Sequence, residues 1–422
     1  MSLLLLWVTL PTWLAIVWRK YLAASPPAVN RDGSPRSIVI FRLDQLGDLV
    51  LTTPLFRELK RLYPGVRCTV VLRSQYKALL TTNRNVDEIL PLRELKAEWL
   101  PSRARWLVSV LWFYWVELRS RQFDFAISPR WDVDESLATM LCALTNAGKR
   151  VGHTSRVSPA KSRINRGFDA AFDVTLPPGP LRHEVDRNLA VADVLGAKIR
   201  SRQPEIVLTQ TDRKFADELL KNHDSGRTLV ALGIGGRAAG RKWPLERYAE
   251  CIARLNEQRL VQPVILCSAD EDGDASALSV KLAVPPYILS GVSLRTVCAV
   301  LERCELFVGN DTGTAHLAAA MNCPTVVVSR HPANGDPTNP NSPARFAPRG
   351  ARFRVLQPQT GKGECLASCR KPEPHCVLQV TAEHVVDSAM DLLPRQQAQR
   401  VVVRADSPFI KPSVVESAMV LA

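Results

Sequence analysis

Short apolar runs alternate with stretches of helical periodicity along most of the chain from Ser37 onwards. The run Ser37–Arg42 (SIVIFR) has the length and composition of a buried strand. Leucines then recur three or four residues apart, as on one face of a helix, at Leu55, Leu59 and Leu62. The repeated order of strand, helix and strand predicts an α/β protein with a parallel sheet and helices on both faces.

The first half of the chain continues this order. Further strands are predicted at Arg67–Arg73, near Glu88–Leu90 and at Phe123–Ser128, with helices at Glu135–Asn146 and His183–Leu195. The stretch Leu43–Asp48 (LDQLGD), directly after the first strand, is predicted to be a loop. The basic stretch from Lys149 to Arg166 contains no acidic residue and is assigned no element.

The second half repeats the pattern after a connecting helix predicted at Thr211–His223. Strands are predicted at Thr228–Gly233, Gln262–Ser268, Leu306–Asn310 and Pro324–Ser329, and Ser293 is expected to cap a helix. A chain of 422 residues accommodates two domains of ordinary size. We place a hydrophobic segment at residues 1–20, one α/β domain at 36–205, a second at 206–395 and an irregular tail at 396–422.

Two segments are unusually apolar. Residues 2–18 carry no charge and precede Arg19 and Lys20, which would keep the rest of the chain in the cytoplasm. No basic region comes before them and no cleavage site is evident, so a signal peptide is not expected. The segment is short for a spanning helix and contains Pro11, so a spanning helix and an interfacial one both fit. The second segment, Trp106–Leu118, fits either a core helix or a helix in a membrane interface.

Charge and cysteine content narrow the function only in part. The formal net charge of +14 favours anionic partners, which include nucleic acid, anionic lipid and phosphorylated substrates. The ten scattered cysteines indicate reduced thiols. Four potential ligands lie close together near the C-terminus, and structural zinc, a disulfide or simple burial would each fit them: Cys365, Cys369, His375 and Cys376.

Two glycine-containing turns are candidate phosphate sites. Gly309–His316 (GNDTGTAH) follows a predicted strand and opens a helix, whose first N–H groups would favour a phosphate, although a tight turn capped by Asp311 also fits. The second turn, Gly233–Gly240, has Arg241 and Lys242 beside it and fits a diphosphate clamp or a flexible connection. No Gly-Lys-Ser/Thr follows it, which excludes a Walker A loop, and no N-terminal GxGxxG supports a dinucleotide dehydrogenase.

Two carboxylates follow the first strand. Asp44 and Asp48 would lie at the carboxyl end of that strand, where open α/β sheets bind ligands. Capping of a helix explains either residue equally well.

Taken together, three ordered motifs resemble the family 9 glycosyltransferases, the bacterial ADP-heptose:lipopolysaccharide heptosyltransferases. They are Arg42–Pro54 (RLDQLGDLVLTTP), Lys242-Trp243-Pro244 with Arg247-Tyr248, and Gly309–Gly313 (GNDTG) with His316–Ala320 (HLAAA). The matches run from about Ser37 to about Leu393, and three motifs in order are far more specific than one. The loop Gly235–Gly240 departs from the family, since it lacks the family's common threonine.

The resemblance implies a GT-B fold, with two Rossmann-like domains facing each other across a cleft. The first domain would bind the acceptor and the second the nucleotide sugar, with inversion at the sugar and no required cofactor or metal. Asp48 matches the family's general base and Lys242 the lysine on the donor phosphates. By the same resemblance Asp311, Thr312, Gly313 and His316 match the family's donor site, to which we add Thr314, Gly235 and Gly236 from the two glycine-containing turns. The predicted acceptor-binding residues are Arg42, Asp44, Lys149, Arg150, Arg163 and Arg166.

We therefore expect transfer of a sugar, a heptose from ADP-heptose, to lipopolysaccharide core or a related lipid-linked phosphorylated glycan. Asp48 would accept the acceptor's proton and Lys242 would stabilise the departing diphosphate. The enzyme is expected at an anionic membrane surface, on the cytoplasmic face of the inner membrane, held peripherally or by its N-terminal segment. Three alternatives remain: a nucleic-acid-binding protein, although no such module is recognisable, a silent nucleotide-sugar-binding protein, and a sugar-nucleotide epimerase.

Overall fold

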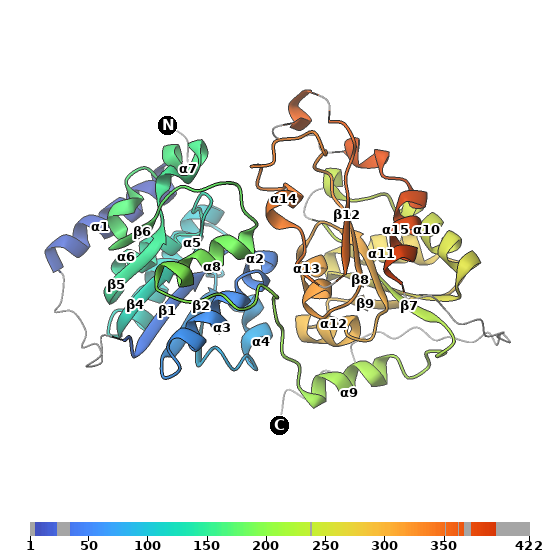
Figure 1. Ribbon diagram of the computed structural model, residues 1–422, viewed down its shortest axis with the longest axis horizontal. Helices are drawn as coiled ribbons and strands as arrows, with labels where there is room; N and C mark the ends of the chain where they lie inside the picture. The colour runs from blue at the N-terminus through green and yellow to red at the C-terminus, as the bar shows by residue number, and fades with distance from the viewer. Residues whose placement is uncertain are drawn as a thin grey trace. The chain divides into compact units, whose positions relative to one another are not determined.

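The protein is described by a computed structural model, which covers residues 5–22, 34–236, 239–350, 352–361, 363–366 and 373–393. The chain forms two compact units, Met1–Val207 and Leu208–Ala422, each built around its own sheet (Figure 1). The tail expected at residues 396–422 lies outside the described residues.

The first unit contains a six-stranded sheet in the order β3-β2-β1-β4-β5-β6. Its strands are β1 (Ser37–Arg42), β2 (Arg67–Arg73), β3 (Glu88–Leu92), β4 (Gln122–Ser128), β5 (Asn146–His153) and β6 (Val174–Leu176). All neighbouring strands run parallel. This confirms the parallel sheet predicted from the alternation of elements.

Helices cover both faces of this sheet. Val39 and Phe41 of β1 pack into a cluster with side chains from helices on one face, and the alternate residues Ile38 and Ile40 are also fully buried. Burial on both faces explains why β1 is an uninterrupted apolar run. The helical elements of the unit are η1 (Leu5–Thr9), α1 (Leu10–Leu22), α2 (Leu46–Val50), α3 (Thr53–Leu62), η2 (Ser74–Tyr76), α4 (Lys77–Leu80), α5 (Ser102–Phe113), η3 (Tyr114–Leu118), α6 (Ala138–Leu144), η4 (Ser155–Val157), α7 (Pro159–Ile164), η5 (Phe168–Ala171) and α8 (Glu184–Val194).

Two sequence-based assignments in this unit were wrong, and one stretch that was assigned no element forms regular structure. The predicted loop Leu43–Asp48 contains the start of α2, and the predicted helix Glu135–Asn146 is reduced to α6 because Asn146 begins β5. The basic stretch from Lys149 to Arg166 forms strand and helix rather than an unassigned connection. Its strand β5 (NAGKRVGH) has no apolar run, so pairing with β4 on one side and β6 on the other, and not local preference, makes it a strand.

The second unit repeats the same architecture, with strand order β12-β11-β10-β7-β8-β9. Its strands are β7 (Thr228–Gly233), β8 (Val261–Cys267), β9 (Tyr287–Ser290), β10 (Leu306–Asn310), β11 (Thr325–Val328) and β12 (Phe353–Leu356). Its helical elements are α9 (Gln210–Leu219), η6 (Ala239–Arg241), α10 (Leu245–Gln258), η7 (Ala269–Glu271), α11 (Asp272–Ser279), α12 (Leu294–Leu301), α13 (Gly313–Ala320), α14 (Pro343–Phe346), η8 (Gly363–Leu366), η9 (Cys376–Gln379) and α15 (Ala382–Leu392). In both units the first and fourth strands are neighbours, which is the Rossmann order.

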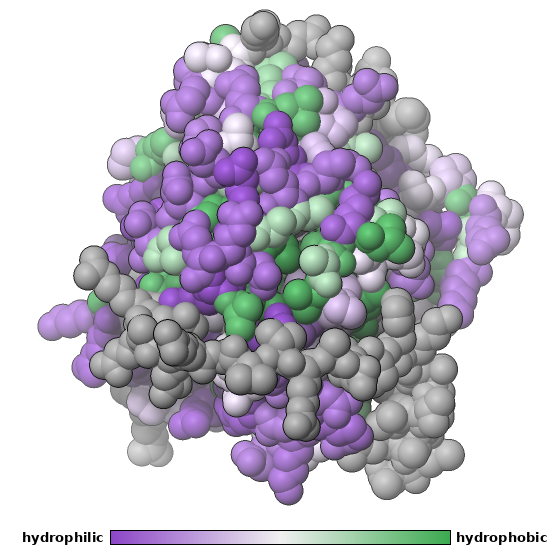
Figure 2. Space-filling model, turned by 90° about the vertical axis from the view of Figure 1, so that its right-hand side faces the viewer, coloured by the Kyte–Doolittle hydropathy of each residue, from purple (hydrophilic) through white to green (hydrophobic). Residues whose placement is uncertain are grey.

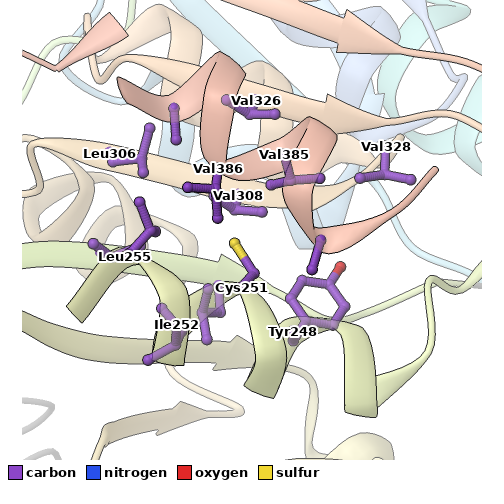
Figure 3. Close-up of a cluster of buried hydrophobic side chains, with 14 of the residues drawn as sticks. Tyr248, Cys251, Ile252, Leu255, Leu306, Val308, Val326, Val328, Val385 and Val386 are labelled. Carbon is purple, nitrogen blue, oxygen red and sulfur yellow. The ribbon is translucent and has the colours of Figure 1, made fainter. Parts of the chain in front are cut away.

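The core of the second unit lies between the sheet and two helices. Figure 3 shows side chains of α10, among them Ile252 and Leu255, facing valines of β10, β11 and α15. These side chains are nearly or fully excluded from solvent. The burial explains the helical spacing of apolar residues in α10, because one face of that helix covers the sheet.

The two apolar segments form helices in the first unit. Trp106–Leu118 lies within α5 and η3, and most of the N-terminal segment lies within η1 and α1. Across the described part of the chain, we find no helix with both the length and the apolar character required to cross a bilayer.

We expect Leu255→Ala to lower the free energy of unfolding by about 2–5 kcal/mol, because it opens a cavity beneath α10. Val280, which is 86% exposed in the same unit, supplies the control, and Val280→Ala should stay within about 0.5 kcal/mol of the parent. Urea unfolding followed by circular dichroism measures both values. Equal stability of the two variants would contradict the assignment of this core.

Candidate functional site

Polar side chains gather at one place in each unit, the carboxyl ends of the first and fourth strands. In a parallel sheet of this order, the chain leaves these two adjacent strands in opposite directions, and ligands bind in the opening. In the first unit the strands are β1 and β4, and in the second they are β7 and β10. Each group of residues is described within its own unit.

In the first unit, two arginines and three carboxylates form a buried cluster. Arg42 ends β1, and its Nη2 lies 3.4 Å from Asp48 Oδ1 and 3.5 Å from Glu184 Oε1. Its Nη1 lies 3.4 Å from Asp44 Oδ2. Arg130 follows β4, and its Nη1 lies 3.3 Å from Asp48 Oδ1 and 3.4 Å from Asp44 Oδ1. The structure thus brings together Arg42, Asp44 and Asp48, all three of which the sequence singled out as site residues, and adds Arg130 and Glu184, which the sequence did not indicate.

Asp48 has two roles in this geometry. Its Oδ2 accepts a hydrogen bond of 3.1 Å from the Gln45 backbone N–H, which caps α2. Its Oδ1 faces the two guanidinium groups of Arg42 and Arg130. The capping interpretation of this residue is confirmed, and capping with one oxygen fixes the direction of the other, while its role as base stays a prediction.

The electrostatics of the cluster follow from its burial. Desolvation raises the pKa of Asp44, although Arg130 and Arg42 oppose the shift. Burial disfavours the charged form of Arg130, but the carboxylates of Asp44 and Asp48 outweigh it and raise the pKa of this guanidinium. The side chains of Arg42 and Glu184 have no exposed surface. Removing one charge from such a set would leave its partner buried and uncompensated.

Lys161 fixes the segment that carries Arg130. Its Nζ donates hydrogen bonds of 2.9 Å to the Arg130 carbonyl and 3.0 Å to the Trp131 carbonyl. Burial lowers the pKa of this lysine to about 8. The sequence signal that could have identified Arg130 is its place directly after a predicted strand that must neighbour β1 in a Rossmann sheet.

The remaining predicted acceptor residues lie elsewhere in the first unit. Arg150 lies on β5 opposite Ala126, three residues before that strand ends, and its Nη2 donates 2.6 Å to the Thr145 carbonyl. Lys149 lies 5.3 Å over the Phe125 ring. Arg163 and Arg166 are exposed, on α7 and just after it. None of these four side chains has a recorded interaction with the Asp48 cluster, and they stay predictions.

In the second unit, the side chain of Asn310 joins the two glycine-containing turns. Its Oδ1 accepts 2.8 Å from the Trp243 backbone N–H, and its Nδ2 donates 3.0 Å to each of the carbonyls of Ile234 and Gly235. Asn310 ends β10, one residue before Asp311. A single side-chain amide, that of Asn310, therefore holds three segments together: the glycine loop, the Lys-Trp-Pro segment and the Asp-Thr-Gly turn.

Lys242 is paired within this group. Its Nζ lies 2.8 Å from Asp274 Oδ2 and 3.0 Å from Glu271 Oε1. Burial lowers the pKa of Lys242, but the hydrogen bonds that its ammonium donates to Asp274 and Glu271 raise the pKa by a larger amount, so the net shift is upward. Glu271 also accepts 3.0 Å from the Gly236 N–H. A Cβ on Gly235 would come within 2.7 Å of the Glu271 carboxylate, so a larger residue here would push that carboxylate away from its contacts with Gly236 and Lys242.

The Asp-Thr-Gly turn leads into α13, which begins at Gly313. Burial raises the pKa of Asp311 to about 6, against the attraction of Arg241 and a hydrogen bond from Ser329. Thr312 and Thr314 are half-buried and His316 is buried. The first N–H groups of a helix attract anions, so the opening of α13 beside Gly235 can receive a phosphate.

The cysteines are thiols wherever the structure describes them. The nine described cysteines form no disulfide. Ligand atoms of Cys365, His375 and Cys376 lie within 4.8 Å of one another, a grouping compatible with a metal ion. Cys369, the fourth expected member, lies outside the described residues.

Comparison with known proteins points to one family. Residues 112–346 match the model of glycosyltransferase family 9 (heptosyltransferase), which is more than half of the chain. The lipopolysaccharide core heptosyltransferase OpsX of Haemophilus influenzae is 23% identical over 297 residues, covering 69% of this chain and 78% of that protein. Lipopolysaccharide heptosyltransferase 3 of Escherichia coli is 24% identical over 286 residues, covering 66% and 79%.

Solved structures show the same fold. A family 9 glycosyltransferase from Veillonella parvula superposes with a TM-score of 0.67 at 20% identity, covering 85% of this chain and 97% of that one. Escherichia coli heptosyltransferase WaaC with ADP gives a TM-score of 0.62 at 17% identity, covering 84% and 99%. The predicted GT-B fold class is confirmed. Because the family model matches more than half of the chain, the chain belongs to glycosyltransferase family 9, the heptosyltransferases.

Proposed function

We propose that this glycosyltransferase transfers a heptose from ADP-heptose, with inversion at the anomeric carbon, to lipopolysaccharide core or a related lipid-linked acceptor. The observation that carries the proposal is the joining, by Asn310, of the glycine loop, the Lys-Trp-Pro segment and the helix-opening turn at one switch point. A sheet of this order binds nucleotides at that point. Family membership and relatives named as lipopolysaccharide heptosyltransferases support the choice of sugar and acceptor.

The second unit supplies the donor site in this proposal. The diphosphate lies against the opening of α13 and the ammonium of Lys242, which exchanges its contacts with Glu271 and Asp274 for phosphate oxygens. Glu271 follows β8, the second strand of the sheet, where Rossmann proteins place the carboxylate that binds ribose hydroxyls. Lys242 and the N–H groups of α13 then stabilise the charge that develops on the departing diphosphate.

The first unit supplies the base. Asp48 accepts the proton from the acceptor hydroxyl as the new bond from that oxygen to the anomeric carbon forms. The bond from the anomeric carbon to the phosphate oxygen breaks at the same time, and ADP leaves with the bonding electrons. Arg42 and Arg130 hold the Asp48 carboxylate in position from two sides. Removing an electrostatic or acid–base contribution of this kind typically costs ~10²–10³ in rate.

The place of action that we propose is the cytoplasmic face of the inner membrane. A lipid-linked acceptor is confined to a surface, and an enzyme held at that surface searches two dimensions. The excess of basic side chains, with a net charge of +14, suits anionic lipid as well as phosphorylated acceptor. Nucleic-acid binding would explain only the positive charge, and the family model that matches is one of glycosyltransferases.

The direct test is an assay of ADP release from ADP-heptose with and without a lipopolysaccharide core acceptor. We expect release only with acceptor. Among nucleoside diphosphates, ADP should raise the unfolding temperature most, since a ligand at 100 times its Kd adds about 2.7 kcal/mol to native stability. Donor consumption without acceptor would point to an epimerase or hydrolase, and preference for another base would overturn the choice of donor.

Asp48→Asn is expected to reduce turnover by about 10² or more, because the variant cannot accept the proton. Donor affinity should be nearly unchanged, as Asp48 lies in the first unit. Single-turnover kinetics and calorimetry with ADP measure the two quantities. Asp193→Asn, at an exposed position on α8, is the matched control. Turnover near the parent value in Asp48→Asn would remove this residue as the base.

Lys242→Ala should weaken ADP binding but leave adenosine binding nearly intact, because in the proposed complex the diphosphate is the only part of the ligand that the ammonium contacts. Loss of a charge-assisted contact of this kind costs about 1.5–3 kcal/mol, or roughly 10–150-fold in affinity. Lys281→Ala, which breaks an exposed pair with Glu246 in the same unit, is the control. Calorimetric titration with both ligands decides the matter. Equal losses for ADP and adenosine would show that Lys242 does not contact phosphate.

A further inference from the structure

Exposed apolar side chains concentrate on two neighbouring helices of the first unit. Ten of the large apolar residues that the described structure exposes lie there: Leu10, Trp13, Leu14, Val17, Trp18, Val108, Leu111, Trp112, Trp115 and Val116. Five belong to α1 and five to α5 with η3. We call these ten residues the apolar platform. In the second unit, by contrast, only Val280 and Leu378 are exposed in this class among the described residues, and hydrophilic side chains cover most of the face in Figure 2.

The first helix of the platform is docked on the protein along its length. Thr12, Ala15 and Ile16 of α1 are buried, and the Trp13 indole N–H donates 3.1 Å to the Arg166 carbonyl. Arg19 donates 2.9 Å to the Ala171 carbonyl. Figure 1 shows α1, in dark blue, at one side of the first unit, where it packs against α6. One face of α1 thus belongs to the fold, and the other presents apolar side chains to the surroundings.

The second helix likewise has one apolar face buried in the protein and one apolar face exposed. Val110, Phe113 and Leu118 are buried in the core of the unit, whereas Trp112 is 61% and Trp115 is 58% exposed. The rings of Trp18 and Tyr114 meet edge to face at 6.3 Å and connect the two helices. Between the helices runs a groove of about 890 Å³, lined almost entirely by apolar side chains and floored by Met140 and Leu144 of α6. One face of the Trp106–Leu118 segment thus belongs to the core, as a core helix requires, and the other face is exposed.

Basic residues flank both helices of the platform along the chain and indicate what covers it, and three of them also form ion pairs within the protein: Arg19 with Asp173, Arg105 with Glu94 and Arg121 with Glu88. The segments 7–20 and 102–121 contain Arg19, Lys20, Arg103, Arg105, Arg119 and Arg121, and only one acidic residue, Glu117. The Arg119 guanidinium lies 4.2 Å over the Trp115 ring. Tryptophan beside arginine is the composition of a membrane interface, where the ring lies among headgroups and the cation meets lipid phosphate. A symmetric dimer through this face would instead bring the basic rims of two copies together.

We propose that the apolar platform is a docking surface for an anionic lipid bilayer, with α1 and α5 lying side by side along the membrane. A docking surface of this kind rests on the proposed function, in which the acceptor is lipid-linked. It deepens that function, because the surface also sets the place of the acceptor site. Arg73 ends β2, stacks at 4.3 Å on Trp106 of α5, and donates 2.7 Å to the carbonyl of Leu43. Leu43 begins the segment that carries Asp44 and Asp48. Two contacts therefore join the membrane-facing helix to the segment of the proposed base.

The test is sedimentation of the full-length protein with vesicles of phosphatidylethanolamine and phosphatidylglycerol (3:1) or of phosphatidylcholine alone, without substrate. The parent should pellet with the anionic vesicles. The double variants Trp112→Ser/Trp115→Ser and Leu14→Ser/Val17→Ser should each lose about tenfold or more in partitioning, because each removes large apolar side chains from the lipid contact. Val280 is also apolar and is 86% exposed, but it lies in the second unit. The control variant Val280→Ser should therefore bind as the parent does.

Folding and function are followed separately. Each variant should keep its stabilisation by ADP and its turnover of a soluble, delipidated acceptor, and lose turnover of acceptor embedded in vesicles. If a double variant does not fold, quenching of the parent's tryptophan fluorescence by brominated lipid replaces it, and strong quenching is expected. Vesicle binding needs no substrate, so it can fail or succeed whatever the outcome of the transfer assay.

Three results would overturn the proposal. The first is that the parent ignores anionic vesicles or shows no quenching by brominated lipid. The second is that both double variants fold and partition like the parent. The third is that the parent is a dimer in sedimentation equilibrium and the platform variants are monomers, which would assign the surface to a second copy of the chain.

Discussion

The parallel order of each sheet places its first and fourth strands side by side, and both candidate sites depend on that neighbourhood. Connections from these strands run to opposite faces, so the polar groups at their carboxyl ends are left uncovered by a crossover helix. In the first unit this brings Arg42 next to Arg130, 88 positions apart in the chain. In the second it brings the end of β10 next to the loop after β7, where one amide, Asn310, spans the gap.

Cations in both clusters are already paired with carboxylates. Arg42 and Arg130 contact Asp44 and Asp48, with Glu184 on Arg42, and Lys242 contacts Glu271 and Asp274. Pairing keeps these buried or half-buried charges from being left unsolvated. Under the proposed function an anionic ligand would replace these existing partners, so the geometry would be preorganised and the energetic gain would be the difference between two sets of contacts.

The apolar platform lies on helices that pack around the sheet of the first unit. Helices that cover a sheet bury one face, and the outer face is ordinarily polar. On α1 and α5 both faces are largely apolar, which a protein surrounded only by water would leave as a large exposed patch. The arginines at the rim and the stacking of Arg73 on Trp106 connect that surface to the loop of Asp44 and Asp48.

The αβ alternation could be predicted from the sequence, because strands buried on both faces appear as uninterrupted apolar runs such as Ser37–Arg42 and Leu306–Asn310. The segments that carry Asp48, Lys242 and Asp311 could also be identified, since glycine and polar residues after such runs are local signals. Strand β5 was missed, because its polar sequence becomes a strand only by pairing with its neighbours. Arg130, Glu184 and Asn310 were likewise decided by tertiary structure, because their importance lies in contacts between segments far apart in the chain. The two faces of Trp106–Leu118 could not be separated from composition, since a helix apolar all round looks the same whether packing hides one side or both.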